Sequence, residues 1–165
     1  MAQSTISTDL FVSGNIGSKS MTIPASAVTD ASVAALSGVQ ASKLQHQYQP
    51  VHSDLSTAAA TTQQKTIYIV QGATATLVGF VAGAVVPLTG NDTCTIDLWK
   101  NGTTVLTAAV ALANTDTARL LKAGSFAATS AVVGDFFEIK ITYTHLTGTA
   151  PSGVFARLTI REDAQ

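Results

Sequence analysis

The chain is short of charged residues. Only 12% of its 165 residues are Asp, Glu, Lys or Arg, and they sum to a formal net charge of −1, against about 25% charged residues in a typical soluble domain. Nine Lys and Arg against ten Asp and Glu leave no basic surface for nucleic acid. A disordered chain would carry more charge, and a coiled coil would need Glu, Lys and Leu in heptads. The composition therefore disfavours all three classes.

Cysteine and long apolar runs are also scarce. Cys94 is the single cysteine, which excludes an intramolecular disulfide, and we expect it to be a small buried hydrophobic residue. The longest apolar run, residues 77–88, is too short for a membrane-spanning helix, which needs about 20 residues. The first ten residues lack the basic and apolar regions of a secretory signal. We therefore expect folding in a cytoplasm, with no membrane partner.

Small residues and threonine are abundant in the chain. The chain has 26 Ala, 24 Thr and 14 Ser, and abundant Thr and Val with few charges favour β structure. The pattern changes near residue 65. We therefore divide the chain into an arm with its linker, residues 1–65, and a body, residues 66–165.

The arm has apolar residues in groups too small to build a core. One short helix is expected over residues 31–36, capped by Thr29 or Asp30 and ended by Gly38, and residues 54–65 are expected to be a polar connector. Soluble monomers rarely expose such apolar groups, so we expect them to be buried at partner contacts. The residues are Leu10, Phe11, Val12, Ile16, Ile23, Val28, Leu36, Val39, Leu44 and Tyr48.

The body has the pattern of an antiparallel β-sandwich. Strands are expected over residues 66–70, 75–86, 93–99, 103–112, 117–121, 136–144 and 154–161. The last two alternate strictly between apolar and polar positions, which is typical of sheets with one buried face. Residues 66–163 should therefore fold without the arm. Phe155 falls on the outer face of its strand, so we expect it at a subunit contact.

Asn101-Gly102 predicts a hairpin between two of these strands. A two-residue loop would pair Lys100 with Thr103. A three-residue loop would pair Trp99 with Thr103 and place Gly102 in a bulge. We favour the three-residue loop because it keeps more apolar residues on one face.

No arrangement of residues predicts catalysis or a cofactor. His46 and His52 do not match a zinc spacing, so polar contacts at an interface are expected for them, and His145 should be exposed. Five acidic residues are accounted for by turns and solvated faces: Asp92, Asp97, Asp116, Asp135 and Glu138. A sugar-stacking platform of Trp99, Tyr143 and Phe155 is a weaker alternative. We expect a protein that is not an enzyme and that holds no metal.

Several segments resemble a family of tailed-phage structural proteins, the capsid decoration or cement proteins. The resemblance lies in residues 23–49, most specifically in residues 28–48 (VTD…ASKLQHQY), and in DLWKNGTTVL, VVGDFFEIKIT and PSGVFARLTIRED. It implies a jelly-roll body, often trimeric, that sits outside an icosahedral head and bridges capsomers. The implied partners are the major capsid protein and further copies of the chain. The implied location is the virion, after synthesis in the host cytoplasm.

Two other functions stay open at the level of sequence. The chain could be a tail-fibre or baseplate module whose body binds a host glycan, or a free carbohydrate-binding module. The copy number per particle distinguishes a tail-fibre or baseplate module from a cement protein. A cement protein is present in hundreds of copies and a fibre in tens or fewer. A free module would be a monomer that binds a glycan column.

Overall fold

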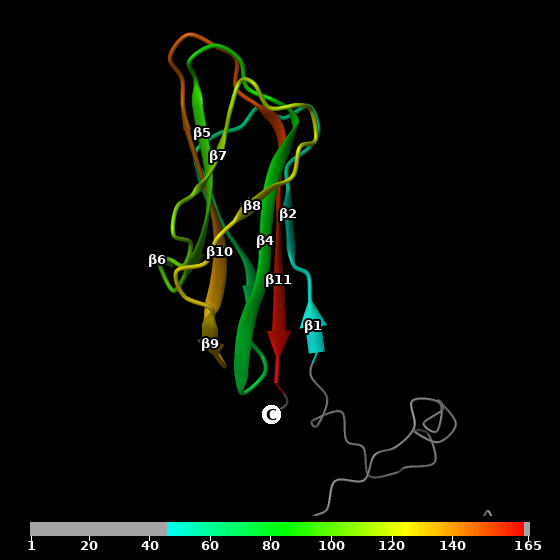
Figure 1. Ribbon diagram of the computed structural model, residues 1–165, viewed down its shortest axis with the longest axis vertical. Helices are drawn as coiled ribbons and strands as arrows, with labels where there is room; N and C mark the ends of the chain where they lie inside the picture. Colours follow the sequence, from blue (N-terminus) through cyan, green and yellow to red (C-terminus); the bar gives the residue numbers. More distant parts are fainter. Residues whose placement is uncertain (1–45, 164–165) are drawn as a thin grey trace, which may run out of the picture. The chain divides into compact units, whose positions relative to one another are not determined.

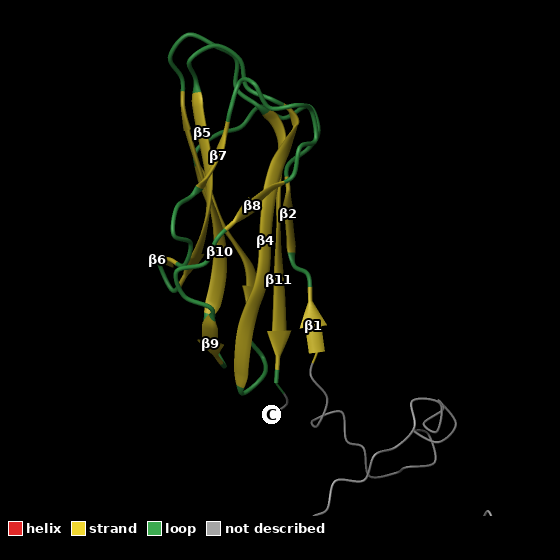
Figure 2. Ribbon diagram, in the orientation of Figure 1, coloured by secondary structure: helices red, strands yellow, loops and turns green. Residues whose placement is uncertain are grey.

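The computed structural model describes residues 46–163. These residues form eleven β-strands and no helix, and the strands build two antiparallel sheets (Figure 1, Figure 2). The all-β class predicted from the sequence is therefore confirmed. The helix expected over residues 31–36 lies outside the described residues.

The six-stranded sheet is built around the two longest strands, β4 and β11, which pair along most of their length. Its order is β1-β11-β4-β8, with β2 also paired to β11 and β9 also paired to β4. Figure 1 shows β11 between β4 on one side and the short strands β1 and β2 on the other. Their bounds are β1 His46–Tyr48, β2 Val51–Ser53, β4 Thr74–Val86, β8 Lys122–Gly124, β9 Ser130–Val132 and β11 Ser152–Glu162.

The five-stranded sheet forms the other layer. Its order is β3-β10-β5-β6, with β7 also paired to β5. The strands are β3 Gln63–Ile69, β5 Thr93–Lys100, β6 Thr103–Thr104, β7 Val110–Leu112 and β10 Phe136–Thr144. Because β10 and β5 pair over eight residues, they form the centre of this sheet.

The inward faces of both sheets share one hydrophobic core, as in a β-sandwich. The alternation predicted for the last two strands is confirmed, since their inward residues are at most 1% exposed. They are Phe137, Ile139 and Ile141 of β10, and Val154, Ala156, Leu158 and Ile160 of β11. Cys94 is buried among them, as expected, at 1% exposure.

The predicted division at residue 65 is wrong in its position. β1 and β2 pair with β11, and residues 63–65 belong to β3 and pair with β10. Ala60 is 2% exposed and belongs to the core. Residues 46–53 and 63–65 therefore belong to the sheets, and the connector expected over residues 54–65 is limited to residues 54–62, between β2 and β3. The polar composition of residues 54–65 does not reveal this, because the segment is fixed mainly by backbone hydrogen bonds, such as Asp54 N to Val154 O and Ala60 N to Pro151 O.

The hairpin at Asn101-Gly102 has the two-residue loop, and the favoured three-residue loop is wrong. Lys100 pairs with Thr103 and Trp99 pairs with Thr104. Both loop residues have positive φ, 50° for Asn101 and 81° for Gly102, as a type I′ turn requires. The turn's twist decided the register, although apolar matching across the strands favoured the alternative.

Replacing Gly102 by Val is expected to destabilise the body by about 1–3 kcal/mol, the range for strained backbone. A Cβ at this position would meet no atom within 4 Å, so the cost comes from the positive φ alone. Denaturant unfolding of the variant measures it. Thr103→Val, next to it on the exposed side of the hairpin, is the control and should change the unfolding midpoint little. An unchanged midpoint for Gly102→Val would contradict the turn.

Two other predicted strands differ from the structure. The strand expected over 103–112 is split into β6 and β7, with Val105 and Leu106 turned into the core between them. Residues 117–121 form a loop, where Arg119 has a φ of 60° and Leu120 N donates to Thr117 O. β8 and β9 follow this loop and were not predicted, because three residues are too few for a clear alternation.

Candidate functional site

Nine of the eleven predicted contact residues lie outside the described residues: Leu10, Phe11, Val12, Ile16, Ile23, Val28, Leu36, Val39 and Leu44. Tyr48 and Phe155 lie within them. Tyr48 is in β1 and stays 41% exposed, with its ring centre 5.7 Å from that of Tyr68 in β3. One side of Tyr48 is therefore packed against its own body, and the rest is available to a partner.

Phe155 lies half-buried on the outer face of the six-stranded sheet. It pairs with Gly83 of β4, and a Cβ at Gly83 would come within 2.8 Å of the Phe155 ring and 2.3 Å of the Leu120 carbonyl oxygen. Glycine at position 83 therefore makes room for the ring and for the loop that precedes β8. The outer-face position predicted for Phe155 is confirmed, and its own chain covers part of the ring.

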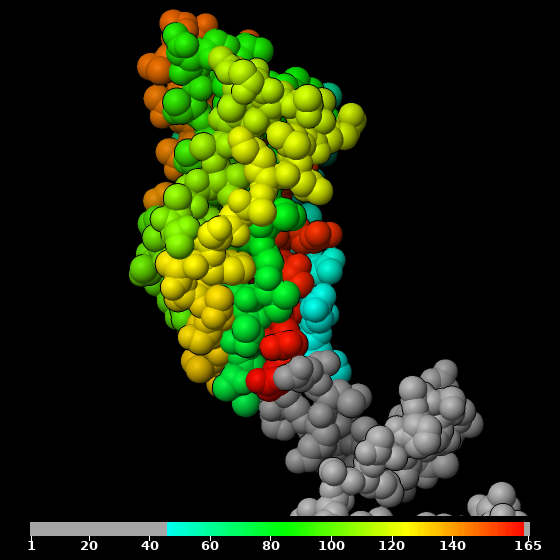
Figure 3. Space-filling model, in the orientation of Figure 1, coloured from blue at the N-terminus to red at the C-terminus, as the bar shows by residue number. Residues whose placement is uncertain are grey.

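A hollow of about 260 Å³ opens beside Phe155. We call it the outer hollow. It is lined by Val51, Ser53, Val81, Leu121, Phe155, Ala156 and Arg157. Figure 3 shows the neighbourhood from one side, with β11 in red between the green of β4 and the cyan of β1 and β2.

The outer hollow is apolar and has one charged lining residue, Arg157. Val51 and Leu121 are each 58% exposed at it. Its volume is slightly below that of small-molecule pockets, which start at about 300 Å³, so it fits one or two side chains. Burying an aliphatic side chain there would contribute about 1.5–3 kcal/mol. The hollow is therefore suited to holding a polypeptide segment.

A polar cluster around Asp92 joins two loops at one end of the body. Asp92 Oδ1 accepts the backbone N–H groups of residues 146, 147 and 148 at 2.8–3.0 Å, and Oδ2 accepts the Tyr143 hydroxyl at 2.5 Å. His145 Nδ1 lies 3.0 Å from Oδ2. Burial alone would raise the pKa of Asp92, but these hydrogen bonds outweigh it and hold the pKa well below its usual range. The carboxylate stays charged and ties the loop in place.

The Asp92 cluster was missed at the level of sequence. His145 is exposed as expected, at 65%, but Asp92 is buried, although a turn or solvated face was expected for it. The register between β5 and β10 brings the cluster together. Thr93 pairs with Thr144, which places the residues just outside the two strands next to each other.

Glu162, the last residue of β11, fixes a turn in the same way as Asp92 fixes its loop. Its carboxylate is 3% exposed and accepts the Tyr68 hydroxyl at 3.0 Å and the backbone N–H groups of Gln71 and Gly72 at 3.0 and 2.9 Å. Burial, followed by this bond to Glu162, raises the pKa of Tyr68. The buried acid therefore closes the turn between β3 and β4.

His52 lies in the core and not at an interface, which corrects the expectation for it. It is 5% exposed, and its Nε2 has no hydrogen-bond partner, with the nearest carboxylate oxygen, of Asp54, at 3.4 Å. Burial lowers the pKa of His52, against the opposing effect of Asp54. His46 is exposed in β1, consistent with a surface role.

His52→Leu is expected to reduce the acid sensitivity of the body. The folded pKa lies below the ordinary value of 6.5, so the neutral form is favoured in the fold. That contribution is complete above pH 6.5 and is lost as the pH falls toward the folded pKa. The melting temperature of the native chain should therefore drop between pH 7 and pH 5, and drop less in His52→Leu. The exposed His46→Gln is the control, and an equal drop in both variants would contradict the assignment.

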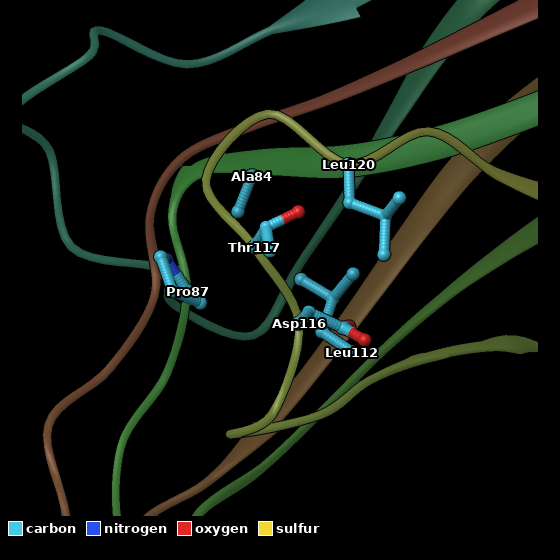
Figure 4. Close-up of a pocket in the computed structure, with 6 residues that line it drawn as sticks. All are labelled: Ala84, Pro87, Leu112, Asp116, Thr117 and Leu120. Atoms are coloured by element: carbon cyan, nitrogen blue, oxygen red, sulfur yellow. The ribbon is translucent and has the colours of Figure 1, made fainter.

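A second, smaller cavity lies beneath the loop between β7 and β8 (Figure 4). It is lined by Ala84, Pro87, Leu112, Asp116, Thr117 and Leu120, and it encloses about 10 Å³, about the space of one water molecule. Asp116 accepts a hydrogen bond of 2.7 Å from the Ala113 N–H, and it forms an ion pair with Lys122 at 3.0 Å. The cavity is therefore a gap under a pinned loop and is too small for a ligand.

The three aromatic residues of the proposed sugar platform do not meet. Trp99 lies on the outer face of the five-stranded sheet, with Lys140 Nζ 3.8 Å from its ring centre and its Nε1 donating to Asp97. Tyr143 packs against the core and bonds Asp92, and Phe155 is on the other sheet. The platform that motivated a glycan-binding function is therefore absent from residues 46–163.

Within residues 46–163, no group of three or more His, Cys, Asp or Glu side chains is placed to hold a metal ion. The same residues contain no helix long and apolar enough to cross a membrane. No family model matches the chain, and no curated protein matches its sequence.

Proposed function

We propose that this chain is a capsid decoration protein of a tailed bacteriophage. In this proposal it binds the outside of an icosahedral head, bridges capsomers and acts as a homotrimer with a jelly-roll body. The observation that carries the proposal is the exposed apolar hollow beside Phe155, in a body whose acidic clusters serve to fix loops. The resemblance of residues 23–49 and of three body segments to decoration proteins supports the same function.

A binding function fits the polar chemistry better than catalysis does. The carboxylates of Asp92 and Glu162 accept hydrogen bonds from backbone N–H groups and from tyrosine hydroxyls. An acid or base for catalysis needs a free position facing a substrate. The outer hollow offers shape and apolar area instead, which are the properties of a contact surface.

Leu121→Asp is expected to weaken binding to phage heads by about tenfold or more, because it places a charge in the apolar hollow. Full-length protein is added to heads stripped of it, and the co-sedimenting fraction is measured. Leu146→Asp is the matched control, since Leu146 is 57% exposed and Leu121 58%, but Leu146 does not line the hollow. Equal binding of both variants would contradict the role of the hollow. No co-sedimentation of the native chain, or tens of copies per particle, would contradict the function.

A further inference from the structure

Arg157 stands between two apolar side chains on the outer face of the six-stranded sheet. It pairs with Val51 of β2 on one side and with Val81 of β4 on the other, and residues that pair directly across strands share a face of the sheet. Phe155 lies two residues earlier on β11 and faces the same way. The outer hollow therefore combines one cation with an apolar wall.

This cation has no hydrogen bond or ion pair within residues 46–163. The four lysines of the same residues are all engaged: Lys65 by Asp54, Lys100 by Asp135, Lys122 by Asp116 and Lys140 over the Trp99 ring. A guanidinium is suited to a two-pronged bond with a carboxylate. The charge of the hollow therefore favours an occupant that carries a carboxylate.

The body already uses its own carboxylates. Each of the eight acidic residues in 46–163 accepts a hydrogen bond from another group of the body. The pairs not yet described are Gln63 to Asp54, Thr104 to Asp97, Asn101 to Asp135, Gln64 to Glu138 and Thr74 to Asp163. A second copy of the body would bring the same engaged carboxylates. A carboxylate from another protein meets no such competition.

The spacing along β11 adds a second requirement for the occupant. Residues 155 and 157 face the same way about 6.7 Å apart, because a strand rises about 3.3 Å per residue. An extended segment that lies along the hollow has the same repeat, so every second side chain faces the sheet. An acidic and a large apolar residue two positions apart can therefore meet Arg157 and Phe155 together.

We propose that the outer hollow binds an extended segment of another protein in which an acidic and a large apolar residue stand two positions apart. The carboxylate binds the Arg157 guanidinium, and the apolar side chain packs against Val81, Leu121 and Phe155. The inference deepens the proposed function and rests on it for the source of the segment, which is the surface of the phage head.

Two peptides of one composition test the chemistry of the hollow with no head present. Acetyl-Ala-Asp-Ala-Leu-Ala-amide has the two side chains on one side, and acetyl-Ala-Asp-Leu-Ala-Ala-amide has them on opposite sides. NMR of the full-length chain follows the methyl signals of Val51, Val81 and Leu121. We expect the first peptide to bind about fivefold more tightly than the second, and about fivefold more tightly than its Asn analogue.

Arg157→Gln should remove the preference for the Asp peptide over its Asn analogue. Arg161→Gln is the matched control and should keep it, because Arg161 is also exposed on β11, has no hydrogen bond or ion pair in residues 46–163 and does not line the hollow. Circular dichroism should show the native fold in both variants. No methyl shift at millimolar peptide, or equal affinities for the peptides, would overturn the proposal. Methyl shifts that grow with the concentration of the chain alone would assign the hollow to a second copy and also overturn it.

Stripped heads test the source of the segment. Coupling ethanolamine to the head carboxylates with a carbodiimide turns them into neutral amides. The native chain should then bind about tenfold more weakly, and Arg157→Gln should bind treated and untreated heads within about twofold of each other. Equal binding of the native chain to both heads would overturn the inference and leave the proposed function standing. A peptide preference without any binding to untreated heads would contradict the proposed function and keep the chemistry of the hollow.

Discussion

A chain that begins at Thr66 is expected to give no cooperative unfolding transition, which reverses the expectation from the sequence that residues 66–163 fold alone. The truncation removes β1 and β2, which cover one edge of β11, and residues 63–65, which pair with β10. It also removes Ala60 from the core and the backbone bond from Asp54 N to Val154 O. Both sheets then lose an edge strand or part of one, and β11 is left with unpaired backbone groups beside its apolar residues.

A chain that begins at His46 is the control for this truncation. It keeps all eleven strands and the whole of the described core, so we expect one cooperative transition. Thermal unfolding followed by circular dichroism distinguishes the two chains. Cooperative unfolding of the chain that begins at Thr66, at a midpoint close to that of the longer chain, would show that residues 46–65 are dispensable to the sheets.

Gly148→Ala is expected to destabilise the body by about 3 kcal/mol, at the upper end of the cost of overpacking. A Cβ at Gly148 would lie 1.7 Å from the Thr89 carbonyl oxygen, and this atom belongs to the backbone and cannot turn aside. Moving the loop would break the bond from Gly148 N to Asp92 Oδ1, which is 2.8 Å long. The substitution therefore forces either a clash or the loss of the cluster that joins the two loops.

Gly134→Ala separates this clash from the ordinary cost of replacing glycine. Gly134 has a φ of 86°, and a Cβ there would meet nothing within 4 Å, so we expect only backbone strain of about 1 kcal/mol. Urea unfolding of both variants measures the difference. If Gly148→Ala costs no more than Gly134→Ala, the two loops are not held together as tightly as the Asp92 contacts indicate.

The candidate site was predictable only in part. Phe155 was placed correctly on the outer face because alternation along β11 fixes the side of each residue. The hollow beside it was not predicted, since its lining comes from β2, β4, β11 and the loop before β8, which lie far apart in the sequence. Gly83 is required there by the Phe155 ring, and no local pattern marks such a glycine. Asp92 and Glu162 were likewise missed, because their partners are brought to them by strand register.

The sequence by itself determined the β class, the inward faces of β10 and β11 and the position of the turn at Asn101-Gly102. These follow from alternation and turn chemistry, which act over a few residues. Tertiary structure decided that residues 46–53 and 63–65 complete the two sheets and that His52 is buried. It also decided that the loop over residues 117–121 bounds a hollow. The physical reason is that backbone pairing is nearly independent of side-chain identity, so a polar segment joins a sheet wherever a neighbouring strand leaves its hydrogen-bonding groups free.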